Sequence, residues 1–213
     1  MEEQIARQRI VEIGRRMYDR RYVASNDGNI SVKLDENTVL TTPTGISKGF
    51  LQEHMLVKVD MEGKVLEGTM KPSSELKMHL RVYRENPKVG AVVHAHPVTA
   101  TAFAVAGISL EEPILTEIVA GLGPVPLAPY ALPGSEEVPE SIAPFCKNYQ
   151  GCLLANHGAL TWGEDLKRAY YHMESLEHYA MILLQTSYII KKVIPLDEKK
   201  IKKLQEIARK VST

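Results

Sequence analysis

Apolar and polar positions in the first third of the chain follow two different periods. Apolar residues first recur at helical spacing, which predicts a helix through Ala6, Ile10, Ile13 and Met17. Turn-forming residues at 24–29 end that helix. Residues 30–34 and 38–42 then alternate between apolar and polar, which predicts a hairpin, and residues 56–59 and 64–66 predict a second one.

The rest of the chain alternates between buried strands and helices. Lys71 to Glu75 predicts a helix start, because a serine can cap the first turn and an acid there favours the helix dipole. Residues 89–96 are nearly all apolar, as in a strand buried on both faces. The remaining pattern predicts strands at 124–127 and 151–155 and helices at 76–86, 99–106, 136–148, 164–190 and 197–211.

Strands joined by both hairpins and helices indicate an α/β fold, in an α+β-like three-layer arrangement. The hairpins in the first third argue against an all-parallel sheet. With 213 residues and 44% hydrophobic content the chain can build one sizeable core. We therefore expect a single domain over residues 1–213, with the helix at 197–211 possible as a peripheral element.

Composition excludes several classes of partner. The chain has 26 basic and 26 acidic residues, which is not the basic excess of a nucleic-acid binder. No stretch approaches the roughly 18 apolar residues of a membrane span, and the first residues lack the apolar run of a signal peptide. Cys146 and Cys152 are too few for a disulfide framework and are interpreted as buried thiols. We expect a cytoplasmic protein.

The segment His94-Ala95-His96 carries the clearest chemical signal. Residues i and i+2 of a strand project from the same face, so both imidazoles can converge on one ion. The apolar run before them would give the rigid support that a metal site needs. The alternative is a pair of structural histidines, hydrogen-bonded at a strand end.

His157 strengthens the metal interpretation. It lies in a turn directly after the predicted strand at 151–155. Three imidazoles and one open position are the arrangement of a catalytic zinc, although a lone histidine here would be an ordinary loop residue. We therefore predict Zn²⁺, with Mn²⁺ or Co²⁺ as alternatives. The other histidines are on predicted helices and are interpreted as structural or surface groups: His54, His79, His172 and His178.

Glu75 is a fourth candidate ligand. It stands at the start of a predicted helix, where peptide dipoles attract anions. A carboxylate beside a divalent ion can ligate it or transfer protons as a general acid–base. The alternative is a glutamate that only caps the helix.

Small residues gather in three turns: Gly28-Asn29, Thr44-Gly45 and Ser73-Ser74. Their backbone N–H groups and hydroxyls can hold a phosphate without a cationic clamp. Taken singly each is only a turn, but beside a metal they predict an anion pocket.

Together these segments resemble the class II aldolase/adducin family. The resemblance covers about residues 5–185 and rests on segments in the family's order, which are 28–31, 42–45, 72–75, 91–96, 128–130 and 156–158. Within the family, Thr42-Pro43-Thr44-Gly45 and Pro72-Ser73-Ser74-Glu75 look most like L-fuculose-1-phosphate aldolase. The resemblance implies a central, mostly antiparallel sheet flanked by helices, and a homotetramer with active sites between subunits.

The resemblance also implies roles for particular residues. His94, His96 and His157 would ligate zinc, and Glu75 would be the acid–base that also coordinates zinc when substrate is absent. The substrate phosphate would be bound by Gly28, Asn29, Thr44, Gly45, Ser73 and Ser74.

The chain departs from fuculose-phosphate aldolase at one catalytic position. No tyrosine lies between Tyr83 and Tyr130, where that enzyme carries one, and Glu117 stands near the place. This resembles the methylthioribulose-phosphate dehydratases, which use a glutamate acid–base in this neighbourhood. The alternative is a surface glutamate.

The resemblance implies zinc-dependent cleavage of a ketose 1-phosphate to dihydroxyacetone phosphate and a short aldehyde. The substrate would be a small phosphorylated sugar. Other reactions of the family remain open: dehydration, epimerisation of a pentulose phosphate, and decarboxylation of a sugar-acid phosphate. A non-catalytic, adducin-like interaction module is the alternative of a different class.

Overall fold

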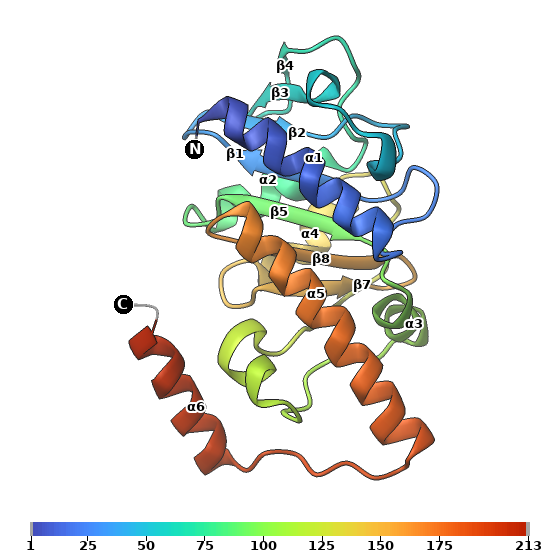
Figure 1. Cartoon of the computed structure of the whole chain (residues 1–213), viewed down its shortest axis with the longest axis vertical. Coiled ribbons are helices and arrows are strands. Elements are labelled where there is room, and N and C mark those ends of the chain that lie inside the picture. The colour runs from blue at the N-terminus through green and yellow to red at the C-terminus, as the bar shows by residue number, and fades with distance from the viewer. Residues whose placement is uncertain (1, 212–213) are drawn as a thin grey trace.

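The structure, a computed structural model, describes residues 2–211 and is built on one eight-stranded sheet (Figure 1). The strand order is β4-β3-β2-β1-β5-β8-β7-β6. Its strands are β1 (Asn29–Lys33), β2 (Thr38–Thr41), β3 (Val57–Asp60), β4 (Val65–Glu67), β5 (Ala91–Ala95), β6 (Leu127–Ala128), β7 (Gly151–Leu154) and β8 (Gly158–Gly163). Only β6 and β7 pair in parallel. The mostly antiparallel sheet expected from the resemblance is therefore confirmed.

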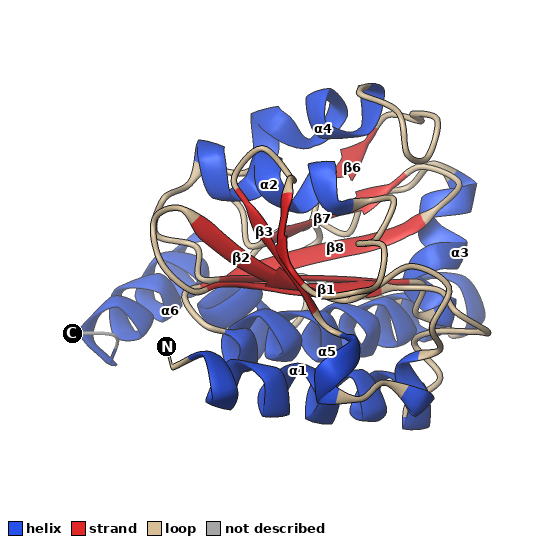
Figure 2. Ribbon diagram, turned by 90° about the horizontal axis from the view of Figure 1, so that it is seen from above, coloured by secondary structure: helices blue, strands red, loops and turns tan. Residues whose placement is uncertain are grey.

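Helices cover both faces of the sheet, so that the protein has three layers (Figure 2). The helices are α1 (Glu3–Asp19), α2 (Leu76–Glu85), α3 (Val98–Ala106), α4 (Glu137–Ile142), α5 (Leu166–Leu183) and α6 (Glu198–Val211). One apolar core lies between the sheet and α1, α3 and α5, and a second lies between the sheet and α2 and α4. Helix α6 packs beside a π-helical turn, η3 (Ile118–Leu122), away from the sheet.

The pattern in the first third of the sequence predicts the local structure closely. Helix α1 buries the predicted stripe, and both hairpins form as β1–β2 and β3–β4. One central strand was not predicted. Strand β8 is wholly buried and pairs with β5 on one side and β7 on the other. It begins and ends with glycine, which disfavours a strand locally, so its conformation depends on its two neighbours.

Several element boundaries differ from the expectation. Helix α2 begins at Leu76, so Glu75 is its N-cap residue and lies before the first turn. The expected helix at 136–148 is shorter, with α4 followed by the short turn η4 (Ala143–Phe145). Helix α5 ends in a π-helical turn, η5 (Leu184–Ile189). Short 3-10 turns, η1 (Lys48–Phe50) and η2 (Glu53–Met55), connect β2 to β3.

Both cysteines are buried free thiols, as predicted. Within residues 2–211 no helix combines the length and apolar character needed to cross a membrane.

The sheet brings the candidate residues together at one end of its central strands. Asn29 of β1 lies directly opposite His94 of β5. On the other side of β5, His94 lies opposite Leu160 of β8. The β7–β8 hairpin carries His157 in its turn, and the N-terminus of α2 presents Glu75 to the same place. Four segments distant in sequence thus meet around one point.

Candidate metal centre

His94 is the most deeply buried of the candidate ligands. Its side chain is fully buried, and Nδ1 lies 2.9 Å from the carbonyl oxygen of Ala159. A carbonyl only accepts hydrogen bonds, so Nδ1 carries the proton and Nε2 keeps a free lone pair. Burial also lowers the pKa of His94 to about 3, which keeps the ring neutral at pH 7.

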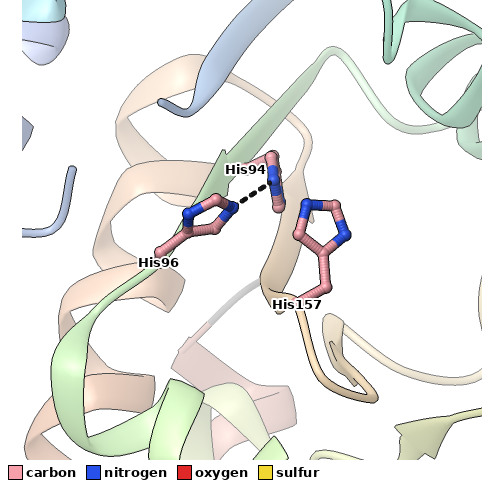
Figure 3. A group of neighbouring side chains, drawn as sticks. All are labelled: His94, His96 and His157. Atoms are coloured by element: carbon pink, nitrogen blue, oxygen red, sulfur yellow. Dashed lines mark hydrogen bonds between the residues drawn. The ribbon is translucent and has the colours of Figure 1, made fainter. Parts of the chain in front are cut away.

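His96 is oriented in the same way by a carboxylate. Its Nδ1 lies 3.3 Å from Oδ2 of Asp27, and that oxygen fixes the proton on Nδ1. The Nε2 atoms of His94 and His96 lie 3.1 Å apart, along the dashed line of Figure 3. Since neither Nε2 carries a proton in these tautomers, two lone pairs face each other across this distance.

His157 completes the group from the β7–β8 turn. Asn156 takes the left-handed conformation there, with φ of 57°. The backbone N–H of His157 donates to the Leu154 carbonyl over 3.0 Å, which fixes the position of His157 in the turn. The ligand nitrogens of the three histidines lie within 4.8 Å of one another, and Figure 3 shows the rings gathered around one point.

The carboxylate of Glu75 closes the group from the opposite side. Oε2 lies 3.3 Å from Nε2 of His94, and Oε1 lies 3.2 Å from Nε2 of His157. The Asn29 amide donates to Oε2 over 2.8 Å. Burial by itself raises the pKa of Glu75, but positive charge at the histidine group and the hydrogen bond from Asn29 outweigh burial and lower it. Glu75 is therefore an ionised carboxylate.

These residues fit a tetrahedral divalent ion. Tetrahedral zinc with bonds of about 2.0–2.1 Å separates neighbouring ligand atoms by roughly 3.3 Å. The closest contacts within the group are 3.1, 3.2 and 3.3 Å. Bare imidazole lone pairs and a carboxylate repel one another at such distances unless a cation lies between them. The set of imidazole nitrogens and one carboxylate is suited to Zn²⁺.

A cavity of about 290 Å³ opens beside the metal group. It contains every residue predicted to bind phosphate, together with Glu75, His96 and His157. Gly28 and Gly45 have φ of 73° and 77°, a conformation that glycine adopts without strain. No lysine or arginine is among the described residues that line the cavity; apart from Asp27, Glu75 and the two histidines, its described lining consists of neutral residues.

Some residues of this site were not predicted from the sequence. Asp27 orients His96, and Pro133 and Gly134 form part of the cavity wall. Asp27 belongs to the predicted turn at 24–29, and an acid between small residues was a usable signal. Nothing in the local sequence around Pro133 connects it with a site formed by β5 and α2.

The structure does not bring Glu117 into this cavity. Glu117 is exposed at the start of η3, where the hydroxyl of Thr116 donates to its Oε2 over 2.8 Å. It is not among the described residues that line the cavity. Any action of Glu117 on the substrate would therefore have to come from a neighbouring subunit.

Comparison with known proteins agrees with this geometry. Residues 8–184 match the family described as Class II Aldolase and Adducin N-terminal domain. The 3-oxo-tetronate 4-phosphate decarboxylase of Pectobacterium atrosepticum is 37% identical over 185 residues, which is 85% of this chain and 84% of that protein. The L-fuculose phosphate aldolase of Methanococcus vannielii is 40% identical over 174 residues, 81% of this chain and 92% of that protein.

Solved structures agree as well. The crystal structure of YgbL from Escherichia coli superposes with a TM-score of 0.88 at 34% identity, over 96% of this chain and 100% of that chain. The matched range extends over most of the chain and spans the positions of the three histidines, Glu75 and the three turns. This chain therefore belongs to the class II aldolase and adducin family.

Proposed function

We propose that this chain is a divalent-metal-dependent lyase that decarboxylates a 3-oxo sugar-acid 4-phosphate. The observation that carries the proposal is the composition of the cavity. The same cavity is lined by the residues proposed to bind phosphate, by histidines of the metal group and by Glu75. Glu117 is not among the described residues that line it. The similarity to 3-oxo-tetronate 4-phosphate decarboxylases supports the same reaction.

The chemistry of such a substrate needs few groups. In a 3-oxo-tetronate 4-phosphate the carboxylate is attached to C2, next to the C3 carbonyl. When the C1–C2 bond breaks, CO₂ leaves and its electron pair forms an enediolate over C2 and C3. Protonation at C2 then gives dihydroxyacetone phosphate. The reaction consumes one proton, and the departing CO₂ needs no acid or base of its own.

The residues of the cavity match these requirements. Ser73, Ser74, Thr44 and the backbone at Gly45 would bind the phosphate and place C3 beside the histidine group. A divalent ion there supplies positive charge that stabilises the developing enediolate. Glu75, ionised while it lies against the histidines, would take up a proton from water once the substrate separates it from them, and would deliver that proton to C2. Water that enters through the open cavity would restore that proton.

Aldol cleavage of a ketose 1-phosphate is the second candidate. It forms the same enediolate of dihydroxyacetone phosphate but releases an aldehyde, whose oxygen exchanges a proton as the bond breaks. The similarity to L-fuculose phosphate aldolases favours it. It also requires a second acid–base, and Glu117 of a neighbouring subunit is the candidate for that role.

The same family includes non-catalytic adducin-like modules, but the intact ligand set supports an enzyme. Zn²⁺ is the favoured ion, with Mn²⁺ and Co²⁺ as alternatives. A homotetramer with active sites between subunits is part of the proposal. Exposed apolar side chains beside the cavity wall support an interface there, since Tyr130 is 62% and Leu132 is 57% exposed next to Pro133.

Product analysis tests the proposal. The zinc-loaded protein is incubated separately with 3-oxo-tetronate 4-phosphate and with L-fuculose 1-phosphate, and dihydroxyacetone phosphate, CO₂ and aldehyde are measured. We expect CO₂ and dihydroxyacetone phosphate in equal amounts from the first substrate, above the spontaneous rate. Aldehyde from the second substrate without accelerated CO₂ release from the first would establish the aldolase instead.

A Glu117→Gln variant separates the two reactions further. Decarboxylation should continue within about twofold of the unmodified protein, because loss of CO₂ leaves no second oxygen to protonate. Aldol cleavage should fall by ~100-fold, the effect of losing a general acid–base. A large fall in CO₂ release would place Glu117 in the decarboxylation mechanism and contradict the roles given above.

A further inference from the structure

A ladder of polar side chains crosses the core beneath the metal group. Glu75, His79 and Tyr83 recur every four residues along one face of α2. Asn29 and Ser31 are two residues apart on the facing side of β1. Four residues of helix rise about 6 Å and two residues of strand about 6.6 Å, so Glu75 and His79 stay in step with the two strand residues.

Each rung of the ladder is a short hydrogen bond. The Asn29 amide donates to Oε2 of Glu75 over 2.8 Å. One turn further along α2, Nδ1 of His79 lies 2.7 Å from Oγ of Ser31. The same Oγ lies 2.8 Å from the Tyr83 hydroxyl. Asn29, Ser31, His79 and Tyr83 are each at most 3% exposed.

Such a ladder determines where α2 sits along β1. The other buried residues of α2 are apolar and include Leu80 and Val82, which pack without strong directional preference. The hydrogen bonds are directional, and each buried polar group that loses its partner costs about 1–3 kcal/mol. A shift of α2 by one residue would therefore break every rung together.

Glu75 depends on this anchoring because its backbone, at the N-terminal end of α2, is weakly fixed. It is the N-cap residue of α2, and its side chain makes no capping hydrogen bond. Its backbone N–H donates to the Ser73 hydroxyl over a long 3.3 Å. His79 is the first residue of α2 beyond Glu75 that is tied to the sheet by a side-chain hydrogen bond among those described.

We propose that His79, held by Ser31, is a positioning residue that fixes the Glu75 carboxylate against the metal and the substrate carbon. The inference rests on the proposed function for what Glu75 does there. His79 itself belongs neither to the histidine group nor to the described residues that line the cavity. It acts through the placement of α2. Its ring is neutral, because burial lowers the pKa of His79 to about 4.

Two replacements separate the hydrogen bond from the mere presence of a buried side chain. Asparagine places an amide atom near the position of Nδ1 and can keep the bond to Ser31. Glutamine places its amide near the position of Nε2, an atom that has no hydrogen-bond partner here. His79→Asn therefore keeps the hydrogen bond to Ser31, whereas His79→Gln loses it. Ser31→Ala removes the same rung from the strand side.

The first readout is the affinity for Zn²⁺, measured on the full chain by competition with a chelator. His79→Gln and Ser31→Ala should weaken Zn²⁺ binding by ~10-fold or more, the scale of a lost supporting contact around a metal. His79→Asn should stay within about threefold. Turnover of the 3-oxo acid phosphate should follow the same order, with kcat falling and KM unchanged, since the phosphate pocket is intact.

A double-mutant cycle shows whether the effect passes through Glu75. In a Glu75→Gln background, His79→Gln should cause little further loss of Zn²⁺ affinity, because the carboxylate that it positions is absent. The matched control is His172→Gln. His172 is also buried with Nδ1 bonded, 2.7 Å from the Trp162 carbonyl, and should lower the thermal stability without changing Zn²⁺ affinity.

Equal losses of Zn²⁺ affinity from His79→Gln with and without Glu75 would overturn the proposal. Equal Zn²⁺ affinities of His79→Asn and His79→Gln would overturn the proposal as well. Failure of the proposed reaction appears differently, as unmodified protein that binds Zn²⁺ but releases no CO₂. The Zn²⁺ affinities then still decide the role of His79.

Discussion

Oε1 of Glu75 lies 3.2 Å from Nε2 of His157, and this buried oxygen has no hydrogen-bond partner. A carboxylate oxygen left in this way in the interior costs free energy unless another group compensates it. A cation between the carboxylate and the imidazoles would supply that compensation. The same oxygen is free to turn toward a substrate carbon when the substrate takes its place.

Replacement of Glu75 by glutamine tests its role in proton transfer. Glutamine keeps the size and one oxygen but cannot carry the proton. We expect Glu75→Gln to retain bound metal and to turn over substrate at least ~100-fold more slowly, the scale of a lost general acid–base. Metal analysis and steady-state kinetics on the same preparation check this. Turnover near that of the unmodified protein would reduce Glu75 to a helix-capping residue.

Gly158→Ala should damage the metal group without altering any ligand. A Cβ at Gly158 would lie 2.5 Å from Cδ2 of His96 and 2.6 Å from the Ala95 carbonyl oxygen. His96 would have to move, and we expect Zn²⁺ affinity to fall by ~10-fold or more. The control is Gly121→Ala, where a Cβ would meet nothing within 4 Å. Equal Zn²⁺ affinity in the two variants would mean that His96 is not held as described.

A negative charge placed among the residues proposed to bind phosphate should weaken phosphate binding. Ser74 is exposed and lines the cavity, so it tolerates a larger polar side chain. Ser74→Asp should weaken competitive inhibition by inorganic phosphate by ~10-fold or more, because a carboxylate repels the phosphate. Ser74→Asn has nearly the same shape without the charge and should have a much smaller effect. Similar inhibition constants in both variants would show that phosphate binds elsewhere.

Much of the metal site follows from sequence periods alone. The two-residue period of a strand predicts that His94 and His96 converge on one point, and a buried run before His157 predicts a ligand at a strand end. Glycine and serine turns likewise indicate the anion pocket. These features are local, so the sequence near each residue contains them.

The remainder depends on pairing between distant segments. Nothing local indicates that Asn29 lies opposite His94, because strand register is set by the assembled sheet. Strand β8 was not predicted for the same reason, because its glycine ends are stabilised by pairing with β5 and β7. His79 was interpreted as a structural or surface histidine. Its bond to Ser31 becomes visible only when α2 lies on β1.

Lys48 should make stability rise with pH. It is 1% exposed, and its Nζ donates to the Ile46 carbonyl over 2.6 Å and to the Asn26 carbonyl over 3.3 Å. Burial lowers the pKa of Lys48 from 10.5 to about 8. Between these values the unfolded chain holds a proton that the native protein has released, so the free energy of unfolding increases with pH.

The gain attributable to Lys48 is about 3 kcal/mol above pH 10.5, and about 2 kcal/mol of it develops between pH 7 and pH 9.5. Denaturant unfolding at pH 7 and pH 9.5 measures it in the unmodified protein and in Lys48→Met, which has no titrating group at this position. We expect the unmodified protein to gain stability relative to the variant as pH rises. A relative loss would show that the Lys48 ammonium is stabilised in the folded state.

The metal content of the purified protein tests the central claim most directly. Elemental analysis should find about one divalent ion per chain, as expected for a site of three imidazoles and a carboxylate. His96→Ala should hold almost none after the same purification, while His178→Ala, which changes an exposed histidine on α5, should keep the full amount. Full metal occupancy in His96→Ala would contradict the centre formed by His94, His96, His157 and Glu75.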